Sequence, residues 1–418
     1  MKRTFILLLS MVAFMAQATD RVVEQSGVSP AYSSIQAAIN AALNGDRILI
    51  KNRPGGIPWI EDLTIAKSLE LLSYDNDVQW IIQGNVSVTS GTNRNITILG
   101  MRNLSGDLSY TTSSGTSRST HVKVIDCSFE SGQVGLQSDA YILDVIHTDI
   151  TDGYIYNYNG NIIGCELNNS TINIFNNNSY RNETVRIIGN KITTPDASSY
   201  GSQGIDINNI TYDFEIKNNL ITACRGISVE KSVSSQTFYI YNNSIRTTRS
   251  TNTAGTHYGA KGLELRHSGQ GSSSATYEIM NNAIDRFNAA NVSNWGIDIY
   301  GQVGDINVYY NWIDSDFAPE FSGSAPTVDF ANNITTAFNI NADGSLPGGS
   351  PLIDGANPDP SFYDLDLSTG DAGAFGGSYT LDNFHPLHTG SARIYMVNYP
   401  FQVRQGSTLN IGADSYDR

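Results

Sequence analysis

From residue 122 onward the chain repeats one pattern of apolar and polar positions. Each copy is a short run of alternating apolar residues, then a small polar residue, most often Asn, then one further residue and an apolar one, as in "VRIIGNKI", "FEIKNNLI", "FYIYNNSI" and "YEIMNNAI". The interval between markers ranges from 17 residues, between Thr148 and Cys165, to 39 residues, between Asn243 and Asn282. Each copy is therefore one supersecondary unit with a loop of variable length, which is typical of a solenoid. The marker positions are Cys127, Thr148, Cys165, Asn190, Asn219, Asn243, Asn282, Asn311 and Asn332.

The repeat predicts an all-β fold, a right-handed parallel β-helix solenoid. Alternation indicates strands, and the repeats leave no room for crossover helices with apolar periodicity. Asn suits the corners because it tolerates the left-handed backbone conformation and its amide can hydrogen-bond to the same residue one coil away. The alternative is an antiparallel sandwich with Asn-rich turns. It is disfavoured because sandwiches do not repeat one turn signature so many times.

The three cysteines, Cys127, Cys165 and Cys224, are expected to be buried and unpaired. Cys127 and Cys165 share the marker column two coils apart, which puts their backbones roughly 9 to 10 Å from each other at ~4.8 Å per coil. A disulfide requires Cα atoms within about 7 Å. The cysteines therefore read as small core residues that replace Asn.

The N-terminal region predicts a helix before the solenoid. In "YSSIQAAINAALNGDRILI", Ser33 is the expected N-cap and Gln36 completes a capping box. We expect residues 19–45 to cap the solenoid, residues 46–340 to form it and residues 341–389 to form a loop-rich C-terminal cap. A helix followed by a "KSL" strand resembles the opening of many secreted parallel β-helix proteins of the pectate-lyase-like superfamily, and this resemblance implies the same fold.

The C-terminal region carries two further resemblances. The stretch "GGSPLIDGANPDPSFYDLDLSTGDAGAFGG" is similar to segments that close bacterial secreted β-helices. Its acidic run, Asp364, Asp366 and Asp371, imitates a calcium loop, although Gly370 comes one place later than an EF-hand requires. Calcium is thus the one candidate cofactor, and a polar cap without a metal is the alternative. Residues 390–418 resemble the start of a PKD-type immunoglobulin-like domain, here truncated.

The first residues and the overall charge limit the location and the partners. Residues 1–18 combine a basic start, an apolar run and an Ala-Gln-Ala ending, which predicts a secretory signal peptide and a secreted or cell-surface protein. The apolar run is shorter than the about 20 residues of a membrane-spanning helix, so we expect no integral membrane segment. A net charge of -15 argues against nucleic acid as a partner. We expect a monomer or a part of a larger multidomain surface protein.

A second pattern aligns four segments on a glycine: "SQGIDINN", "CRGISVEK", "AKGLELRH" and "NWGIDIYG". The apolar residues that follow each glycine point inward, so the residues between them are expected to face solvent. Because coils stack in register, these residues form columns. The first column holds Asp206, Ser228, Glu264 and Asp298, the second holds Asn208, Glu230, Arg266 and Tyr300, and the residues before the glycines are Gln203, Arg225, Lys261 and Trp295.

This mixed-charge face suits a sugar polymer. An extended glycan can lie along stacked coils, Trp295 and Tyr300 offer stacking surfaces, and a cation can pair with a uronate carboxylate. Adjacent Glu264 and Asp298 repel each other, which raises one pKa or attracts a cation. The remaining substrate-binding candidates are Asp206, Arg225, Glu230 and His267.

The stretch from Ser228 to His267 resembles the chondroitinase B and alginate lyase family of β-helix enzymes. That family has a catalytic Lys in a strand similar to "ISVKS" and a catalytic Arg in a strand similar to "LTLRHG", where this chain has "ISVEKS" and "LELRHSG". The resemblance implies that Arg266 neutralises charge or acts as an acid in β-elimination. The family's Lys position holds Glu230, and only a bulge after Val229 would bring Lys231 onto it.

Two functions follow. The first is a secreted polysaccharide-degrading enzyme, either a lyase on uronate-containing glycans with Lys231 or Lys261 as base and Arg266, or a hydrolase with Glu264 and Asp298 as paired carboxyl groups. The second is a non-catalytic surface or adhesive β-helix that binds a glycan or spaces other domains. The imperfect catalytic match favours the second function, and the charged columns are compatible with both.

Overall fold

The computed structural model describes residues 18–75, 78–111, 119–136, 138, 140–157, 159–175, 184–194, 202–210, 212–232, 236–248, 250–251, 257–267, 274–288, 295–301, 304–317, 321–323, 327–385, 392–398 and 411–417. The predicted signal peptide lies outside these residues except at its last position. No helix in the described part is long and apolar enough to cross a membrane.

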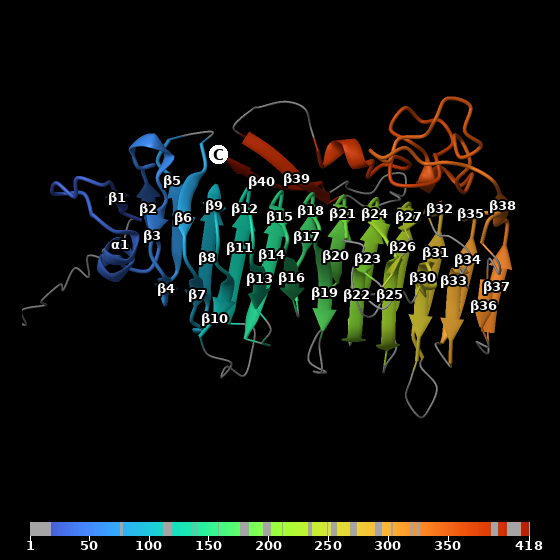
Figure 1. The fold of residues 1–418 in the computed structure, drawn as a ribbon, viewed down its shortest axis with the longest axis horizontal. Coiled ribbons are helices and arrows are strands. Elements are labelled where there is room, and N and C mark those ends of the chain that lie inside the picture. The colour runs from blue at the N-terminus through green and yellow to red at the C-terminus, as the bar shows by residue number, and fades with distance from the viewer. Residues whose placement is uncertain are drawn as a thin grey trace, which may run out of the picture.

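The chain forms a parallel β-solenoid of about ten turns, mostly β, as the repeat predicts. Three long parallel sheets run along its axis (Figure 1), and we call them sheet A with 13 strands, sheet B with 12 strands and sheet C with 11 strands. Each turn passes from sheet A to sheet B and then to sheet C. The sense of the coil stays a prediction.

Sheet A contains β1 (Asp20–Val23), β2 (Asp46–Ile50), β5 (Leu69–Ser73), β8 (Arg94–Leu99), β11 (Thr120–Ile125), β14 (Tyr141–Ile146), β17 (Ile162–Ile163), β20 (Val185–Ile188), β23 (Phe214–Lys217), β26 (Thr237–Tyr241), β31 (Thr276–Met280), β34 (Asp305–Tyr309) and β37 (Thr327–Ala331). Sheet B contains β3 (Trp59–Ile60), β6 (Trp80–Gln83), β9 (Met101–Asn103), β12 (Ser128–Phe129), β15 (Asp149–Thr151), β18 (Glu166–Asn168), β21 (Lys191–Thr193), β24 (Leu220–Ala223), β27 (Ser244–Thr248), β32 (Ala283–Asn288), β35 (Trp312–Asp314) and β38 (Ile334–Thr336).

Sheet C contains β4 (Leu63–Ile65), β7 (Val86–Val88), β10 (Leu108–Tyr110), β13 (Gln133–Leu136), β16 (Tyr154–Asn157), β19 (Thr171–Phe175), β22 (Gln203–Ile210), β25 (Arg225–Ser232), β30 (Lys261–Arg266), β33 (Trp295–Tyr300) and β36 (Phe321–Gly323). Outside the sheets lie α1 (Ile35–Ala41), the 3-10 helices Pro54–Gly56, Pro360–Phe362 and Leu381–Asn383, and the antiparallel pairs β28 (Ser250–Thr251) with β29 (His257–Tyr258) and β39 (Ala392–Asn398) with β40 (Gly412–Asp417).

The core fills the coil with the inward residues of all three sheets. Identical positions of successive turns lie above one another, so like side chains stack along the axis. In sheet A the rings of Phe214, Phe238 and Tyr277 stack with centroids 5.8 and 4.8 Å apart and nearly parallel planes. Each fully buried large apolar side chain contributes about 1.5–3 kcal/mol, so the whole buried core, of which these rings are a part, stabilises the solenoid.

The short corner between sheets A and B uses two columns of residues with different tasks. The first residue of each corner has a left-handed backbone, with φ between 44° and 67°. The second residue turns its side chain into the core. The first column is Asp126, His147, Gly164, Gly189, Asn218, Asn242, Asn281, Tyr310 and Asn332.

The second column is the predicted asparagine ladder. Its amides bond along the axis, with Nδ2 of Asn190, Asn219, Asn243 and Asn282 each 2.9 Å from Oδ1 of the next member. Asn311 continues the ladder to Asn333 at 3.0 Å. The prediction placed the last marker at Asn332, which is wrong by one residue. Asn332 is the left-handed residue of its corner, and the doubled Asn in the sequence hid the difference.

The first part of the same column contains small residues in place of Asn. Cys127, Thr148 and Cys165 are at most 1% exposed, and their side chains donate to carbonyl oxygens of the neighbouring strand. Cys165 joins this part of the column to the ladder, because its backbone N donates to Asn190 Oδ1 at 2.9 Å. All three cysteines are buried and free, as predicted, and burial raises the pKa of Cys127 and Cys165 to about 12.

The helix α1 lies at the N-terminal end of the solenoid (Figure 1) and buries Ile35, Ala38 and Ile39. Its N-cap is Ser34, whose Oγ accepts from Ala37 N at 3.1 Å, so the predicted N-cap Ser33 is wrong by one residue. The expected capping box is replaced by a carboxylate from the solenoid. Glu61 accepts from the backbone N of Ile35 and of Gln36, both at 3.0 Å.

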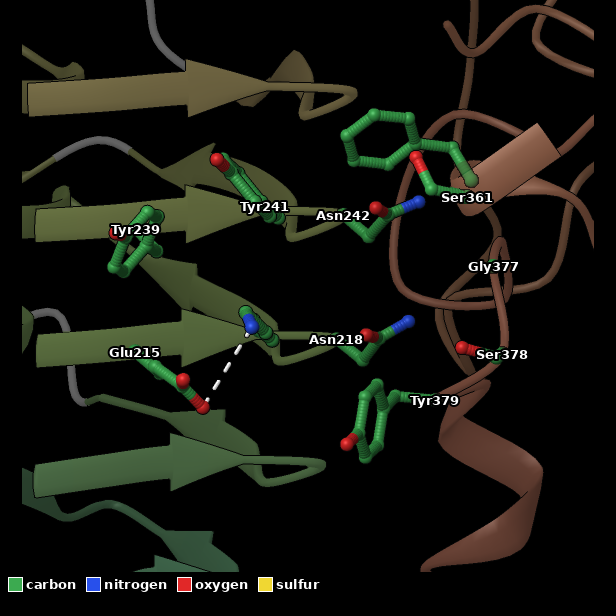
Figure 2. Close-up of a pocket in the computed structure, with 11 residues that line it drawn as sticks. Glu215, Asn218, Tyr239, Tyr241, Asn242, Ser361, Gly377, Ser378 and Tyr379 are labelled. Atoms are coloured by element: carbon green, nitrogen blue, oxygen red, sulfur yellow. Dashed lines mark ion pairs between the residues drawn. The ribbon is translucent and has the colours of Figure 1, made fainter. Parts of the chain in front are cut away.

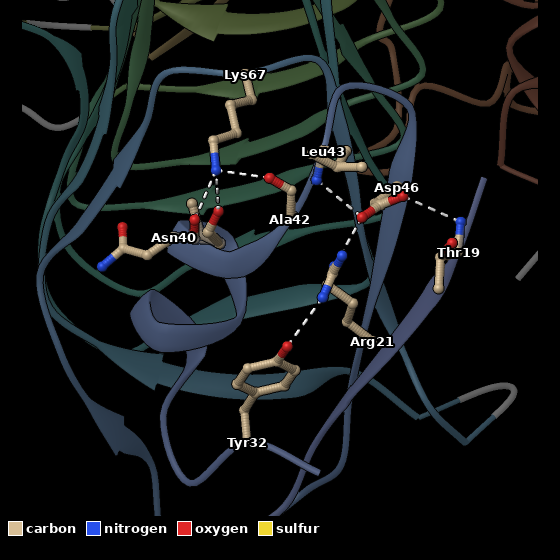
Figure 3. A network of polar contacts seen from close by, with 9 residues as sticks. Thr19, Arg21, Tyr32, Asn40, Ala42, Leu43, Asp46 and Lys67 are labelled. Atoms are coloured by element: carbon tan, nitrogen blue, oxygen red, sulfur yellow. Dashed lines mark hydrogen bonds and ion pairs between the residues drawn. The ribbon is translucent and has the colours of Figure 1, made fainter. Parts of the chain in front are cut away.

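A polar network fixes the other end of α1 (Figure 3). Lys67 Nζ donates to the carbonyl oxygens of Ile39, Asn40 and Ala42 at 2.6–3.0 Å. This places a cation on the carbonyls that the helix cannot bond itself, at the negative end of its dipole. Nearby, Asp46 accepts from Arg21 Nε at 2.7 Å. The helix is therefore tied to the first turns of the solenoid at both ends.

The segment 338–385 runs back along the side of the solenoid, at the A–B corner (Figure 1). Successive contacts move toward the N-terminus: Gly355 O accepts from Trp312, Asn357 N donates to Asn281, Ala374 N donates to Ser244, and His385 bonds Gly189 O. Its predicted role as a cap over the last turn is not confirmed. The segment follows the corner because the left-handed asparagines there point their side-chain amides outward, and these amides form hydrogen bonds with the backbone of the segment.

The pair β39 and β40 continues this path onto earlier turns. Tyr416 packs on Leu99, Ile125 and Ile146, and its hydroxyl lies 2.8 Å from His147 Nδ1. Residues 392–398 and 411–417 thus form an antiparallel pair that lies against the solenoid. The assignment of residues 390–418 as the start of a PKD-type domain stays a prediction.

We predict that Asn243→Ala lowers the free energy of unfolding by about 2–4 kcal/mol. The substitution leaves the backbone N–H and one of the two Nδ2 N–H groups of Asn219 without an acceptor in the core, each at about 1–3 kcal/mol, while the other Nδ2 N–H still donates to Ile187 O. Urea unfolding measures the loss. The control is Asn332→Gly, which keeps a left-handed residue at an exposed corner and is expected to change stability by less than about 1 kcal/mol. Equal losses in the two variants would contradict the two-column corner.

Candidate functional site

The charged columns predicted from the sequence lie on four neighbouring strands of sheet C, β22, β25, β30 and β33. The strand register aligns Asp206, Ser228, Glu264 and Asp298, and beside them Asn208, Glu230, Arg266 and Tyr300. Gln203, Arg225, Lys261 and Trp295 form the third aligned row. The predicted alignment is thus confirmed, and we call this surface the charged face.

The glycine column explains why these strands align so closely. A Cβ added to Gly204, Gly226 or Gly262 would lie 2.2–2.3 Å from Cγ2 of an isoleucine of sheet B. Any larger residue would therefore push the strand away from the core. The glycines let the start of each strand pack directly against the isoleucines of sheet B. This close packing fixes the positions of the charged residues next to the glycines.

Glu264 is the centre of an ionic cluster on this face. Its carboxylate forms ion pairs with Arg225 at 3.3 Å and Arg266 at 3.5 Å, and Lys261 Nζ contacts its other oxygen. Lys261 Nζ also lies 2.6 Å from Asp298 Oδ2 and 5.1 Å from the centre of the Trp295 ring. The cation expected between Glu264 and Asp298 is therefore a side chain of the chain itself.

The expectation that this column faces solvent is wrong for two of its members. Glu264 is 1% exposed and Ser228 is 0% exposed. The reason is lateral cover, because the long side chains of Arg225, Lys261 and Arg266 fold over the short central column to reach the carboxylate. A buried Glu264 is positioned as a structural counter-ion, which disfavours its use as a carboxyl group in hydrolysis.

The edge of the charged face remains accessible. The Arg266 side chain is 29% exposed and pairs with Glu230 at 3.4 Å, and Tyr300, the residue next to Arg266 in the register, is 66% exposed. A guanidinium beside an exposed phenol ring is an arrangement that can receive a sugar carboxylate and stack its ring. Arg266 and Tyr300 are therefore the substrate-binding candidates with the best access.

Asp206 has a raised pKa on this face. Burial raises the pKa of Asp206 to about 6, while Arg266 and Asn208 oppose the rise. Asn208 Nδ2 donates to Asp206 Oδ2 at 2.9 Å, and Asp206 Oδ1 has no hydrogen-bond partner among the described residues. The charge of the face thus changes between about pH 5 and 7.

His267 ends the strand that carries Arg266. Its ring is 8% exposed, and neither ring nitrogen has a hydrogen-bond partner in the described part of the chain. His267 is thus buried, whereas Tyr300 at the edge of the face is exposed. The interpretation of His267 as a substrate-binding residue stays a prediction.

Lys231 is the lysine that the lyase resemblance requires, and its side chain lies outside the described residues. Its backbone belongs to β25, which pairs with β22 without a register shift from Arg225 to Ser232. The bulge after Val229 that would move Lys231 onto the Glu230 side of the strand is therefore not present in this pairing. Lys231 therefore still lies one residue away from the lysine position of that family.

The acidic run near the C-terminus serves the loop in which it lies. Asp364 accepts from the backbone N of Gly377 at 2.6 Å and of Asp371 at 3.1 Å, and Asp366 accepts from Ser368. Burial raises the pKa of Asp364 to about 6. No group of three acidic, His or Cys side chains in the described residues has the geometry of a metal site. In this structure the acidic side chains bond to the backbone of their own loop, and calcium stays a prediction.

A groove that the sequence did not predict lies on sheet A, where β23 and β26 face the segment 361–379 (Figure 2). Its volume is about 590 Å3. Lys217 lies at its floor with its Nζ 3.6 Å from Glu215 and 5.5–5.9 Å from the ring centres of Tyr239, Tyr241 and Tyr379. Burial lowers the pKa of Lys217, and Glu215 opposes this change. We call this cavity the tyrosine groove.

The sequence held a partial signal for the tyrosine groove. Lys217 and Tyr241 occupy the same position of two consecutive repeats, "FEIK" and "FYIY", so alternation places both on the outer side of sheet A. The second wall could not be predicted, because Phe362 and Tyr379 reach the groove only through the course of the C-terminal segment along the solenoid.

Solved structures with a distant similarity to this chain include two lyases. The crystal structure of pectate lyase Pel9A has a TM-score of 0.41 and 14% identity, over 86% of this chain and 96% of that chain. A rhamnogalacturonan lyase has a TM-score of 0.34 and 11% identity, over 70% of this chain and 87% of that chain. No family model matches the sequence, and no curated protein matches it. The parallel β-solenoid is shown by the strand pairing itself, and the similarity to these lyases is distant.

We predict that Glu264→Gln destabilises the protein by about 3–5 kcal/mol, because the substitution leaves three cations crowded around a neutral amide in a buried cluster. The matched control is Glu230→Gln, which removes one partly exposed ion pair and is expected to cost at most about 1 kcal/mol. Urea unfolding of the two variants separates these values. Equal stabilities would show that Glu264 is not the centre of the cluster.

We predict that Asp206→Asn becomes more stable relative to the wild type as the pH rises from about 4 to about 7. The raised pKa means that Asp206 ionises above about pH 4 in the unfolded chain but only near pH 6 in the folded one, so the wild type loses about 2–3 kcal/mol over this interval. Urea unfolding at pH 4, 5, 6 and 7 measures the free energy of unfolding of both proteins. Asp285 and Asp364 also have raised pKa values, but they titrate in both proteins, so their effect cancels in the difference. A difference that is constant over this range would contradict the prediction.

Proposed function

We propose that this protein is an exported polysaccharide-binding β-solenoid, and that its charged face receives a uronate-containing glycan. The observation that carries the proposal is the pairing of a partly exposed Arg266 with a 66% exposed Tyr300 at the edge of four strands in register. Arg266 would hold the carboxylate of a uronate, and Tyr300 would stack on its ring. The parallel strands give an extended surface along which further sugar units can lie.

The partly exposed Arg266 is the cation of this face that can receive an anionic sugar. Arg225, Lys261 and Arg266 supply three cations, while Glu264 is buried among them and cannot meet the ligand. A bound carboxylate would compete with Glu230 for Arg266, because that pair is long and partly exposed. We expect binding to weaken as salt is added, since the exposed part of the interaction is screened.

Cleavage by β-elimination is the second candidate function, and the position of Arg266 favours it. In that reaction a base removes the C5 proton of the uronate, the C4–O4 bond breaks, and the leaving oxygen is protonated. Arg266 would neutralise the carboxylate. Lys231 is the base that the family resemblance implies, but the unshifted pairing of β25 with β22 leaves it off the Glu230 side of the strand, which counts against this second function. Lys261 is poorly suited, because its ammonium already contacts Glu264 and Asp298.

The non-catalytic reading has its own support. The described cations of the charged face are paired with carboxylates of the chain itself, and Glu230 and Glu264 beside Arg266 are its ion-pair partners. Binding without cleavage is thus the proposed main function, and the two readings differ in one measurable product.

We predict that the protein binds polygalacturonate, alginate or a chondroitin polymer, and that Tyr300→Ala weakens this binding about tenfold through the loss of ring stacking. Arg266→Lys is expected to weaken it as well, because Lys cannot hold a carboxylate with two parallel hydrogen bonds. Calorimetry with each polymer, with and without calcium, measures the binding, and the absorbance of unsaturated products in the same samples reports cleavage.

The control for this experiment is Tyr74→Ala, which removes a 43% exposed tyrosine far along the solenoid. It is expected to leave binding unchanged. Unsaturated product from any polymer would establish the lyase, and its loss in Lys231→Gln would identify the base. If none of these polymers binds the folded protein, the proposal fails.

A further inference from the structure

We propose that the tyrosine groove on sheet A is a second binding site, separate from the charged face, and that its ligand is a short neutral saccharide. The two sites lie on different sheets of the solenoid, since β23 and β26 belong to sheet A and the charged face belongs to sheet C. The second site therefore does not depend on the function proposed for the first.

Aromatic rings form both walls of the groove. Tyr239 and Tyr241 come from β26, with ring centres 5.8 Å apart and planes at 71°. Tyr379 comes from the C-terminal segment (Figure 2). Phe362 comes from the same segment, and its ring centre lies 5.8 Å from that of Tyr241, with the planes at 76°. Faces and edges of aromatic rings are suited to the flat C–H surface of a sugar ring, and a volume of about 590 Å3 is within the range of small-molecule sites.

The charges at the floor cancel, which favours an uncharged ligand. Lys217 and Arg186 both pair with Glu215, at 3.6 and 3.2 Å. Glu278 is paired with Tyr239 in the register of sheet A and adds a carboxylate beside the groove, where it accepts from Asn307 Nδ2 at 2.8 Å. A uronate in the groove would thus meet the Glu215 carboxylate with both of its cations already paired, whereas sugar hydroxyl groups can donate to this carboxylate.

One hydroxyl group that lines the groove is available to bond a ligand. The Tyr241 hydroxyl has no hydrogen-bond partner among the described residues, and it belongs to a half-buried side chain that lines the cavity. An unpaired hydroxyl in a partly buried position is costly unless a ligand or water satisfies it. Together with Glu215, this hydroxyl provides the few oriented polar contacts that a sugar site combines with an apolar wall.

The far wall of the groove is anchored. Asn218 Nδ2 donates to the carbonyl oxygens of Ala374 at 3.0 Å and of Gly376 at 2.7 Å, and Gly377 N donates to Asp364 at 2.6 Å. Asn218 is the left-handed residue of its corner, so the same position that turns the coil also holds the wall. Such a preformed groove loses little conformational entropy when it binds a ligand.

The test is calorimetry with tetrasaccharides of β-1,4-linked galactose, xylose, mannose and glucose, and with tetragalacturonate as the charged probe. We expect at least one neutral tetrasaccharide to bind. Tyr241→Ala should weaken this binding by tenfold or more, and Tyr241→Phe, which keeps the ring and removes the hydroxyl, should weaken it about threefold to tenfold.

The matched control is Tyr300→Ala, which alters the charged face and should leave binding of the neutral saccharide unchanged. The proposal is overturned if no neutral tetrasaccharide binds the folded protein, if only tetragalacturonate binds, or if Tyr300→Ala abolishes the binding while Tyr241→Ala has no effect. Circular dichroism of each variant confirms that the solenoid is intact. Failure here leaves polymer binding at the charged face unaffected, so the two proposals are tested separately.

Discussion

The structure depends on one constraint: successive turns must stack in register at the corner between sheets A and B. The ladder from Asn190 to Asn333 meets this constraint inside the coil, because each amide bonds to the same position of the next turn. A one-residue slip would break every one of these bonds and would turn each strand's apolar residues outward. Register, and with it every column of side chains, is therefore fixed at the corner.

The doubled asparagine of the repeat performs two tasks at once. In "NN" the second residue belongs to the ladder, and the first has the left-handed backbone and points its amide outward. Asn218, Asn242 and Asn281 use these outward amides to bond the backbone of the segment 357–376. Where the corner instead has Gly189, the ring of Phe384 occupies the space that a Cβ would need. The C-terminal segment thus follows the corner, and the tyrosine groove exists because it does.

The sequence predicts the periodic part of the molecule well, because periodic residues repeat the same physical task. The ladder, the buried cysteines and the aligned columns on sheet C all follow from patterns that recur every turn. The errors at Ser33 and Asn332 are shifts of one residue, in places where two residues of the same type stand side by side. Periodicity gives the number and direction of strands, but a doubled residue leaves the position within a corner undetermined.

What the sequence could not predict are contacts between parts that are distant in the chain or crowded laterally. Alternation correctly placed Glu264 on the outer side of its strand, yet long cations from its own and neighbouring strands cover it, so outward did not mean accessible. Similarly, Lys217 reads as a surface lysine until Tyr379, far along the chain, closes over it. In a solenoid each outward column is a row of equivalent positions, and only the neighbours decide which of them become buried counter-ions and which remain free to bind. The side chains that a ligand can contact therefore lie in two places. One is the edge formed by Arg266 and Tyr300, and the other is the tyrosine groove beside the C-terminal segment.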